Sequence, residues 1–425
     1  MPQPQRHFWQ SGLWRHPDFL KLWSAQSVSL IGLQFGSLAM PLVAVLTLHA
    51  GGAAVGLLAG LGTLPWLIFG LFVGPLIDRL PRRPVVVTAH AGRAVLVAFI
   101  PIAAAVHVLT MWQLYVITVL SGALSMCFEV AYHAYLPAVV DTGQLADANA
   151  KLAVTDGIAR TTGPGVAGSA VQLLSAPLTL VVQAATYTYA ALAVARIGQR
   201  GAPSDRHGRE PALAALRAGI AFTWRHRIIR SLTLCEASYL LFFDMLGAII
   251  IVFYSRNLGL SPSIIGAIYT AGSVGGIFGG LLARRIGLRF RAGRALLVGA
   301  LLRGIGLAII PVAIFLGPYA VPLLIACRAV NAFGWTVWEV HQTTTLQLST
   351  PDRLRGRVTA SSLFLARAAG SAGGFAGAGL AVMLGVTGTV WVGAIGSLAG
   401  TAWLLARPVR RLREVRAAAA PSLTQ

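Results

Sequence analysis

Apolar residues run in long stretches along nearly the whole chain, and short polar stretches separate them. Most apolar stretches hold about twenty residues, which is enough for a helix to cross a ~30 Å hydrocarbon core. Helices are expected because, in lipid, each backbone N–H and C=O group must find its partner within its own segment. The pattern therefore predicts an all-α integral membrane protein with about twelve transmembrane helices. We place them at residues 20–46, 54–77, 84–107, 112–136, 150–174, 177–197, 229–254, 262–284, 293–316, 320–347, 357–384 and 387–406.

The composition agrees with a membrane protein. Only 11% of the residues are charged and 56% are hydrophobic, whereas a soluble protein carries about 25% charged residues. Residues 1–18 are polar and basic, so we expect no removable signal peptide. The three cysteines lie singly within apolar stretches, and we expect neither a disulfide nor a metal site.

The net charge of +21 would suggest a nucleic-acid partner in a soluble protein. Here the arginines gather in alternate connections, for example Arg82, Arg206, Arg291 and Arg411, and we assign only Arg256 to the opposite side. Because cytoplasmic loops of membrane proteins carry an excess of arginine and lysine, we place both termini and the central connection in the cytoplasm. The sequence predicts a multi-pass protein of the inner (cytoplasmic) membrane. Its basic surface would attract anionic lipid rather than nucleic acid.

The chain repeats itself with a shift of 210 residues, with three residues deleted towards the end of the match. Charged residues are rare inside membranes, so several of them at matching positions indicate two six-helix halves in parallel repeat. We predict an N-terminal bundle at residues 1–197, a cytoplasmic linker with an amphipathic surface helix at 198–228, and a C-terminal bundle at 229–425. The matched pairs are Gly56 with Gly266, Arg93 with Arg303, Glu129 with Glu339, Arg160 with Arg367 and Gly163 with Gly370.

Two six-helix repeats about an axis along the membrane normal describe the major facilitator architecture, and a loop motif adds to this resemblance. The run G-P-L-I-D-R-L-P-R-R resembles the loop signature of that superfamily, although Pro81 stands where the family has glycine. The resemblance implies a charged latch in which Asp78 meets basic residues, and a plain solvated turn is the alternative. The signature residues are Gly74, Asp78, Arg79, Arg82 and Arg83.

The fifth stretch carries G-P-G-V-A-G, with Gly163, Pro164 and Gly168, which is similar to the antiporter motif of drug exporters. Ser371 replaces the proline in the second copy. The runs L-A-D-A-N-A-K and P-D-R-L-R-G-R-V resemble the branch that contains enterobactin exporters and macrolide-efflux proteins. Glycines let helices approach closely, and proline removes an amide donor and bends a helix. The glycines either only pack helices or also help to seal one state of the transporter.

Three charged residues in each half reach a similar depth, near the cytoplasmic mouth. Because buried charges survive in lipid chiefly by pairing, we predict two Arg–Glu–Arg clusters there. We favour a structural role for them over direct contact with the substrate, and ion pairs at a moving boundary would also bias which state prevails. The clusters are Arg93, Glu129 and Arg160 in the first half and Arg303, Glu339 and Arg367 in the second.

Two acids on the seventh predicted helix have neutral glutamines as their repeat partners. The resemblance places the first, fourth, seventh and tenth helices around the central cavity. An acid near mid-membrane can be titrated by a proton or by a competing cation, which is the chemistry of coupling; a static pair of Asp244 with Arg328 is the alternative. Tryptophans at this level would suit a bulky, partly apolar substrate. The candidate cavity residues are Asp244, Glu236, Gln34, Gln26, Arg328, Trp335 and Trp338.

These observations predict a secondary transporter that works by alternating access as a monomer. We expect proton-coupled efflux of a drug-like or natural-product molecule, such as an antibiotic or a siderophore. An importer of a small metabolite is the first alternative, and a non-transporting receptor or scaffold is a more remote one. No nucleotide-binding loop motif occurs in the sequence, and we find no metal-ligand spacing and no nucleophile with a base. We therefore expect no cofactor and no enzymatic activity.

Overall fold

The computed structural model describes residues 12–69, 80–198, 212–351 and 354–405, together with Val73 and Ile77. Within these residues the regular elements are helices and no β-strand occurs. By their contacts the residues divide into unit 1, residues 1–48 and 68–209, and unit 2, residues 49–67 and 210–425. Helix α2 (Gly52–Phe69) therefore groups largely with unit 2, although it lies early in the chain. The bundle boundaries at 197 and 229 stay a prediction.

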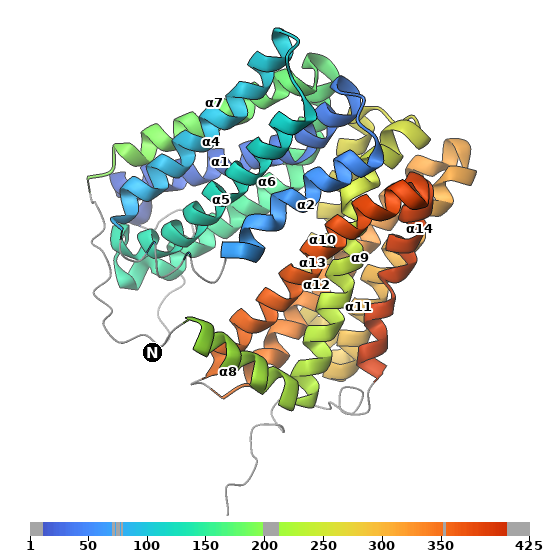
Figure 1. Cartoon of the computed structure of the whole chain (residues 1–425). Coiled ribbons are helices and arrows are strands. Elements are labelled where there is room, and N and C mark those ends of the chain that lie inside the picture. Colours follow the sequence, from blue (N-terminus) through green and yellow to red (C-terminus); the bar gives the residue numbers. More distant parts are fainter. Residues whose placement is uncertain are drawn as a thin grey trace, which may run out of the picture. The chain divides into compact units, whose positions relative to one another are not determined.

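Unit 1 consists of long helices that run alongside one another (Figure 1). Helix α1 packs against α6 and α7, and α4 packs against α5 and α7. Small residues let α1 and α7 approach closely, since a side chain in place of Gly32 would overlap Thr186 and one in place of Gly36 would overlap Gln183. The helices are α1 (Pro17–Leu42), α4 (Arg82–Ala105), α5 (Met111–Val139), α6 (Leu145–Leu174) and α7 (Ala176–Ala195).

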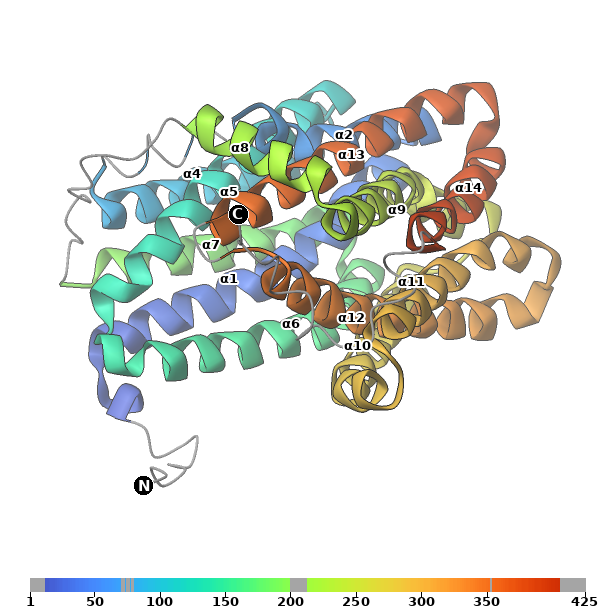
Figure 2. The same ribbon diagram turned by 90° about the horizontal axis from the view of Figure 1, so that it is seen from below.

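Unit 2 holds the helices of the second half of the chain in addition to most of α2. Helix α12 packs against α10 and α11, and α13 packs against α9. The linker helix α8 leads directly into α9 (Figure 2) and packs against α13. The helices are α8 (Ala212–Arg225), α9 (Arg227–Val252), α10 (Pro262–Arg289), α11 (Ala292–Ala308), α12 (Ala320–Leu348), α13 (Arg355–Met383) and α14 (Gly385–Gly396).

The internal repeat is visible in the helix boundaries. Helices α1 and α9 begin and end at positions that differ by 210 residues, and each continues into a five-residue π-helical segment, Val43–Thr47 and Phe253–Asn257. Both also begin after a histidine, His16 or His226, whose ring nitrogen accepts a hydrogen bond from a first-turn amide. Such a cap satisfies a backbone donor that the helix itself leaves free. The predicted duplication is therefore confirmed at the level of backbone register.

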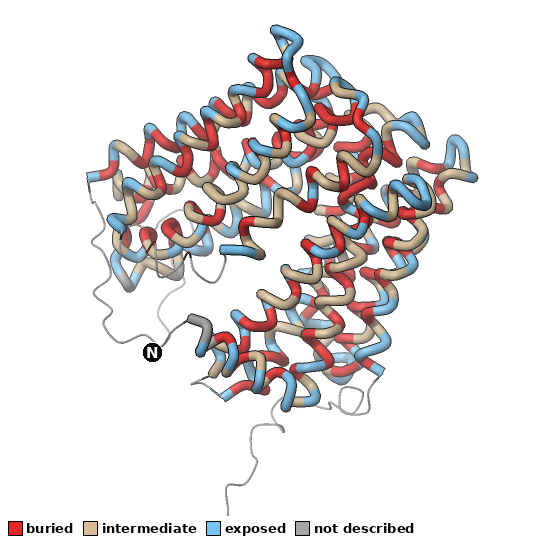
Figure 3. Tube along the Cα trace, viewed as in Figure 1, coloured by how far each residue is buried: buried red, intermediate tan, exposed pale blue. Residues whose placement is uncertain are grey.

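Ten helices in the described residues are long and apolar enough to cross a membrane. Helices α6 and α13 are long enough, with 30 and 29 residues, but are less apolar. Exposed and buried residues alternate along the helices (Figure 3). Many exposed residues are large and apolar, such as Leu173 at 83% and Phe315 at 77% exposure. Arg303 is buried instead, at 1%. A surface of this kind is suited to lipid rather than to water, so the chain is a multi-pass membrane protein.

Candidate functional site

Unit 2 encloses a cavity of about 450 Å³ between α9, α12 and α13. Its walls combine apolar, hydroxyl, amide and charged side chains, and its volume is in the range that small-molecule sites occupy. Both Glu236 and Glu339 line it, together with Arg367 and Trp335. The other lining residues are Thr233, Leu240, Gln342, Thr343, Leu346, Gln347, Thr359, Ser362, Leu363 and Ala366.

Glu236 forms an ion pair with the buried Arg303 of α11. The Arg303 Nη1 atom donates to the Glu236 Oε2 atom at 2.6 Å. The guanidinium carbon lies 3.9 Å from the ring centre of Tyr239 and 4.3 Å from that of Trp338. Asn331 donates to the Tyr239 hydroxyl and to the Arg303 carbonyl, both at 2.8 Å. A buried cation is thus held by one carboxylate and two aromatic faces, as a desolvated charge requires.

Two more carboxylates join this pair in one electrostatic network. Arg367 acts on Asp244 and on Glu339, and Glu339 also experiences the charges of Arg303 and Glu236. Electrostatic interactions therefore link three carboxylates to two guanidinium groups, and of these only Glu236 and Arg303 are in direct contact. Counted over these five groups, one negative charge is left without a counter-charge when all are ionised. A proton or a cationic ligand can supply that charge.

Gln34 and Asp244, which differ in charge, each lie against a glycine at the repeat-related position. A side chain at Gly163 of α6 would meet the Gln34 side chain, and one at Gly370 of α13 would meet the Asp244 carboxylate. Each polar side chain of α1 or α9 thus lies against the glycine of the neighbouring repeat-related helix. The two halves share this contact but differ in its charge.

The predicted cluster of Arg93, Glu129 and Arg160 is wrong in its pairing. Arg93 is buried, and its Nη2 atom donates to the hydroxyl of Tyr187. Glu129 is exposed, and Arg160 is bonded to Asp156 one turn earlier, with 2.7 Å between Nε and Oδ2. The cluster was predicted because the three residues lie at a similar depth in the membrane. Equal depth does not make side chains face one another, because successive residues point about 100° apart around a helix.

In the second predicted cluster the direct partner of Arg303 is Glu236 and not Glu339. Glu339 and Arg367 are exposed and face the cavity instead of being buried. From the sequence, Glu236 was assigned to the central cavity and not to the Arg303 cluster, because its repeat partner, Gln26, carries no charge. The amide oxygen of Gln26 is buried and has no hydrogen-bond partner among the described residues.

Two further cavity candidates lie elsewhere. The Arg328 guanidinium lies over Tyr269 of α10, 4.7 Å from the ring centre. Among the described salt bridges none joins it to Asp244, so the alternative of a static pair is wrong for this structure. Trp338 is fully buried against Arg303, whereas Trp335 is the tryptophan that lines the cavity.

The loop signature is only partly described, since Gly74, Asp78 and Arg79 lie outside the described residues. Arg82 donates to the Ala134 carbonyl of α5 at 2.9 Å, and Arg83 donates to the Ala195 carbonyl at the end of α7. Arg83 therefore contacts a carbonyl at a helix C-terminus, where a positive charge is favourable, and Arg82 links α4 to α5.

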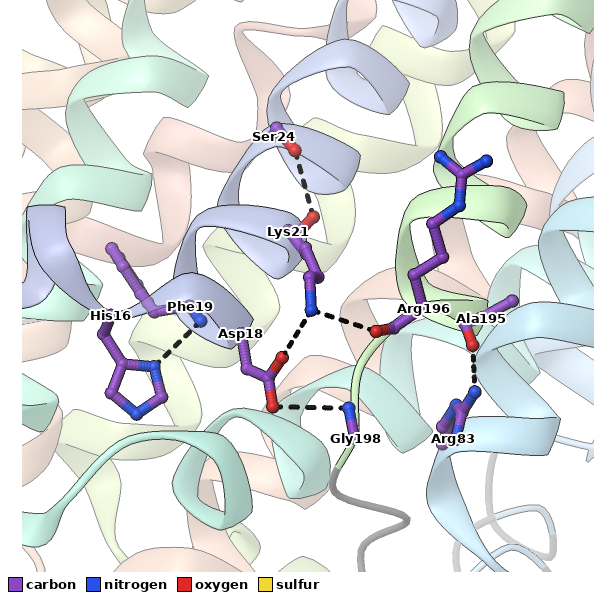
Figure 4. A network of polar contacts seen from close by, with 9 residues as sticks. All are labelled: His16, Asp18, Phe19, Lys21, Ser24, Arg83, Ala195, Arg196 and Gly198. Carbon is purple, nitrogen blue, oxygen red and sulfur yellow. Dashed lines mark hydrogen bonds and ion pairs between the residues drawn. The ribbon is translucent and has the colours of Figure 1, made fainter.

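Figure 4 shows that Lys21 has the same role beside Arg83. Its Nζ atom donates to the Arg196 carbonyl at 3.0 Å and to Asp18 at 2.8 Å. The second Asp18 oxygen accepts a hydrogen bond from the Gly198 amide at 3.3 Å. The ends of α1, α4 and α7 are thereby tied together at one end of unit 1.

The two copies of the glycine-rich motif are used differently. Helix α6 continues through Pro164 as a single helix, and Gly163, Pro164 and Gly168 are buried. In the second copy the hydroxyl of Ser371 accepts a hydrogen bond from Thr63 of α2 at 3.1 Å. Proline has no side chain or amide that can form this bond. The substitution therefore gives α13 a polar contact that α6 lacks.

Tyr187 and Tyr239 lie against the two buried arginines and were not among the residues predicted from the sequence. Acids were the expected partners, whereas a phenol is a second class of partner that combines an aromatic face with a hydroxyl. Their signal was weak, because a tyrosine in an apolar helix is not unusual.

The model of the transmembrane secretion effector family matches residues 12–424. The chain belongs to this family of major facilitator transporters. It is 28% identical over 340 residues to the multidrug efflux pump Tap of Mycolicibacterium fortuitum, covering 77% of this chain and 81% of Tap. It is also 24% identical over 241 residues to YfiS of Bacillus subtilis (strain 168), an uncharacterized MFS-type transporter, covering 55% and 56% of the two chains.

Solved structures show the same fold. The nucleoside transporter NupG aligns with a TM-score of 0.75 at 11% identity, covering 92% of this chain and 98% of NupG. A bacterial homologue of the iron transporter ferroportin aligns with a TM-score of 0.70 at 17% identity, covering 91% and 98%. At these identities the structures support the fold alone. This secretion-effector chain is a transporter and not an enzyme.

Proposed function

We propose that the protein exports a cationic, partly apolar small molecule of the drug or natural-product class in exchange for protons. It would do so by alternating access, as a monomer in the cytoplasmic membrane. Export is supported by the similarity to Tap, whose name describes a multidrug efflux pump. Import of a small metabolite is the competing function, and the direction of transport distinguishes the two.

The observation that carries this proposal is the excess carboxylate in unit 2. Asp244, Glu236 and Glu339 share Arg303 and Arg367, so the network accommodates one additional positive charge. A proton and a cationic substrate would compete for it, and such competition couples their movement in opposite directions. The cavity offers Trp335 and Leu240 to the apolar part of the same molecule.

Asp244 is the acid whose removal tests coupling most cleanly. Glu236 holds the buried Arg303, so its loss would also disturb folding, whereas Asp244 lies against Gly370 and is not hydrogen-bonded to that arginine. In Asp244→Asn the network has two carboxylates for two guanidinium groups and no longer needs a proton.

The experiment begins with a panel of antibiotics and siderophore precursors, applied to cells with and without the protein, to select a substrate. Purified protein in liposomes is then given a pH gradient. We expect wild type to accumulate substrate against its gradient in exchange for protons, and Asp244→Asn to lose this accumulation while retaining expression and downhill exchange. Gln34→Asn, at the repeat-related position, is the matched control and should retain coupling. Full gradient-driven transport by Asp244→Asn would contradict the assignment of Asp244 as the coupling residue. Movement of the substrate in the same direction as protons would favour import.

The proposed orientation follows from the arginine distribution. Single cysteines placed at Arg206 and Arg411 should be protected from impermeant thiol reagents in intact cells, because both positions would be cytoplasmic. Labelling from outside would reverse the assignment of both termini.

A further inference from the structure

The interior of unit 1 contains a buried cation at Arg93, on α4. Arg93 is 4% exposed, and its guanidinium carbon lies 3.9 Å from the ring centre of Tyr187 and 6.0 Å from that of Phe128. The Tyr187 hydroxyl accepts hydrogen bonds from Arg93 and, at 3.1 Å, from the Gln183 amide. The ring of His90, itself 1% exposed, packs 4.4 Å from Phe128 between ring centres.

This cation has no negative partner in the described part of the chain, where no salt bridge includes Arg93. Its Nε atom and the Nδ1 atom of His90 are both buried without a hydrogen-bond partner there. Burying a charge without an opposite charge is strongly unfavourable, so groups of this kind normally bind a counter-ion or pair with an acid.

The repeat shows which residue would otherwise supply the acid. Arg303, 210 positions after Arg93, is bonded to Glu236 of α9. The same shift carries Glu236 back to Gln26 of α1, which has nearly the shape of glutamate but no charge. Phe128 corresponds in the same way to Trp338, so the aromatic contact of the arginine is kept and its acid is not.

Glu129 does not replace the missing acid. It directly follows Phe128, whose ring faces Arg93, and it is exposed. Successive helical residues point about 100° apart, so Glu129 reaches Arg93 only if α5 turns. The repeat-related Glu339 has the same orientation in unit 2: it lines the cavity, and the preceding residue, Trp338, lies against Arg303.

We infer that unit 1 binds a small monovalent anion, of the size of chloride, beside Arg93 and His90. The anion supplies the charge that Glu236 provides in unit 2. We assign as its donors the guanidinium Nε–H and the His90 Nδ1–H, which are both without partners in the described residues; this requires the histidine tautomer protonated at Nδ1. This site is independent of the proposed proton coupling, since it shares no residue with the acidic network of unit 2.

Thermal unfolding of the purified full-length protein tests the site. Sodium chloride is exchanged for sodium gluconate at constant ionic strength, so that screening is unchanged. Because a ligand stabilises the state that binds it, wild type should unfold about 3 °C higher in chloride at a concentration roughly 100 times the dissociation constant. Gln26→Glu builds the acid of unit 2 into unit 1, and we expect this variant to be stable in gluconate and indifferent to chloride. A wild type indifferent to chloride, or a Gln26→Glu variant with undiminished dependence, would overturn the inference.

Two further variants guard the conclusion. Glu236→Gln copies the arrangement of unit 1 into unit 2, so its stability should depend more strongly on chloride than that of wild type; an unchanged dependence counts against the inference. Glu129→Gln should respond to chloride as wild type does. If Glu129→Gln instead increased the chloride dependence, Glu129 would be the counter-charge of Arg93 and the proposed anion site would be wrong.

Discussion

Unit 1 and unit 2 have the same helix register but different charges at matching places. Gln34 lies against Gly163 in unit 1, and Asp244 lies against Gly370 in unit 2. In unit 2 the buried Arg303 has an acid as partner, whereas Arg93 in unit 1 has a tyrosine. Gln26 and Glu236 differ little in shape, and Asp244 is one methylene shorter than Gln34, so each contact is kept while the charge is present in one half only. The comparison indicates that the two units share their helix register and differ in the charges they place at matching positions.

The largest effect is expected at Glu236. Because Glu236→Gln leaves Arg303 buried without an acid, we expect it to lower the free energy of unfolding by about 3–5 kcal/mol. Gln26→Ala, at the repeat-related position, breaks no ion pair and should cost much less. Thermal unfolding of both variants in the same gluconate buffer measures the difference, because chloride could replace the lost acid. Equal losses would contradict the view that the two halves differ in charge and not in packing.

Glycine substitutions come next and compare the same contact in both units. A Cβ atom at Gly163 would lie 2.5 Å from the Gln34 Cγ atom and 2.6 Å from its Cβ atom, which is close to the backbone and cannot move away. At Gly370 the first obstacle is the end of the Asp244 side chain. We expect Gly163→Ala to destabilise the protein by about 1–3 kcal/mol and Gly370→Ala to cost less stability but to impair coupling. Unfolding and gradient-driven transport, measured together, check both. If Gly163→Ala lost less stability than Gly370→Ala, the packing of Gln34 against Gly163 would be contradicted.

The smallest effect is expected for Glu129→Gln. Glu129 is exposed, so we expect a change within about 0.5 kcal/mol in unfolding free energy, as for other surface positions. Glu339→Gln should instead reduce transport, because Glu339 lines the cavity and belongs to the shared network. Comparing unfolding and uptake for the two variants distinguishes these roles. A strongly destabilised Glu129→Gln protein would restore the cluster with Arg93.

The sequence sufficed to predict the helices, the repeat and the residues that differ between its halves. Periodic apolar stretches determine helices in lipid, and a rigid shift of 210 residues identifies equivalent positions such as Arg93 and Arg303. The ion pairs were not predictable in the same way, because distance along a helix gives depth but not direction. Glu129 and Glu339 have the right depth, but Phe128 and Trp338 are the residues that face the arginines.

The contact between α2 and α13 has a consequence for the order of assembly. Thr63 and Ser371 are 308 positions apart, and a Cβ atom added to Gly374 would lie 3.1 Å from the Gly60 Cα atom. At synthesis rates of about 5–20 residues per second, roughly 15–60 s separate the emergence of these helices from the ribosome. Throughout that interval the face of α2 that carries Gly60 and Thr63 is without its native partner. The second helix to be made is therefore among the last to reach its native neighbours, and a ribosome that stalls before α13 leaves it without them.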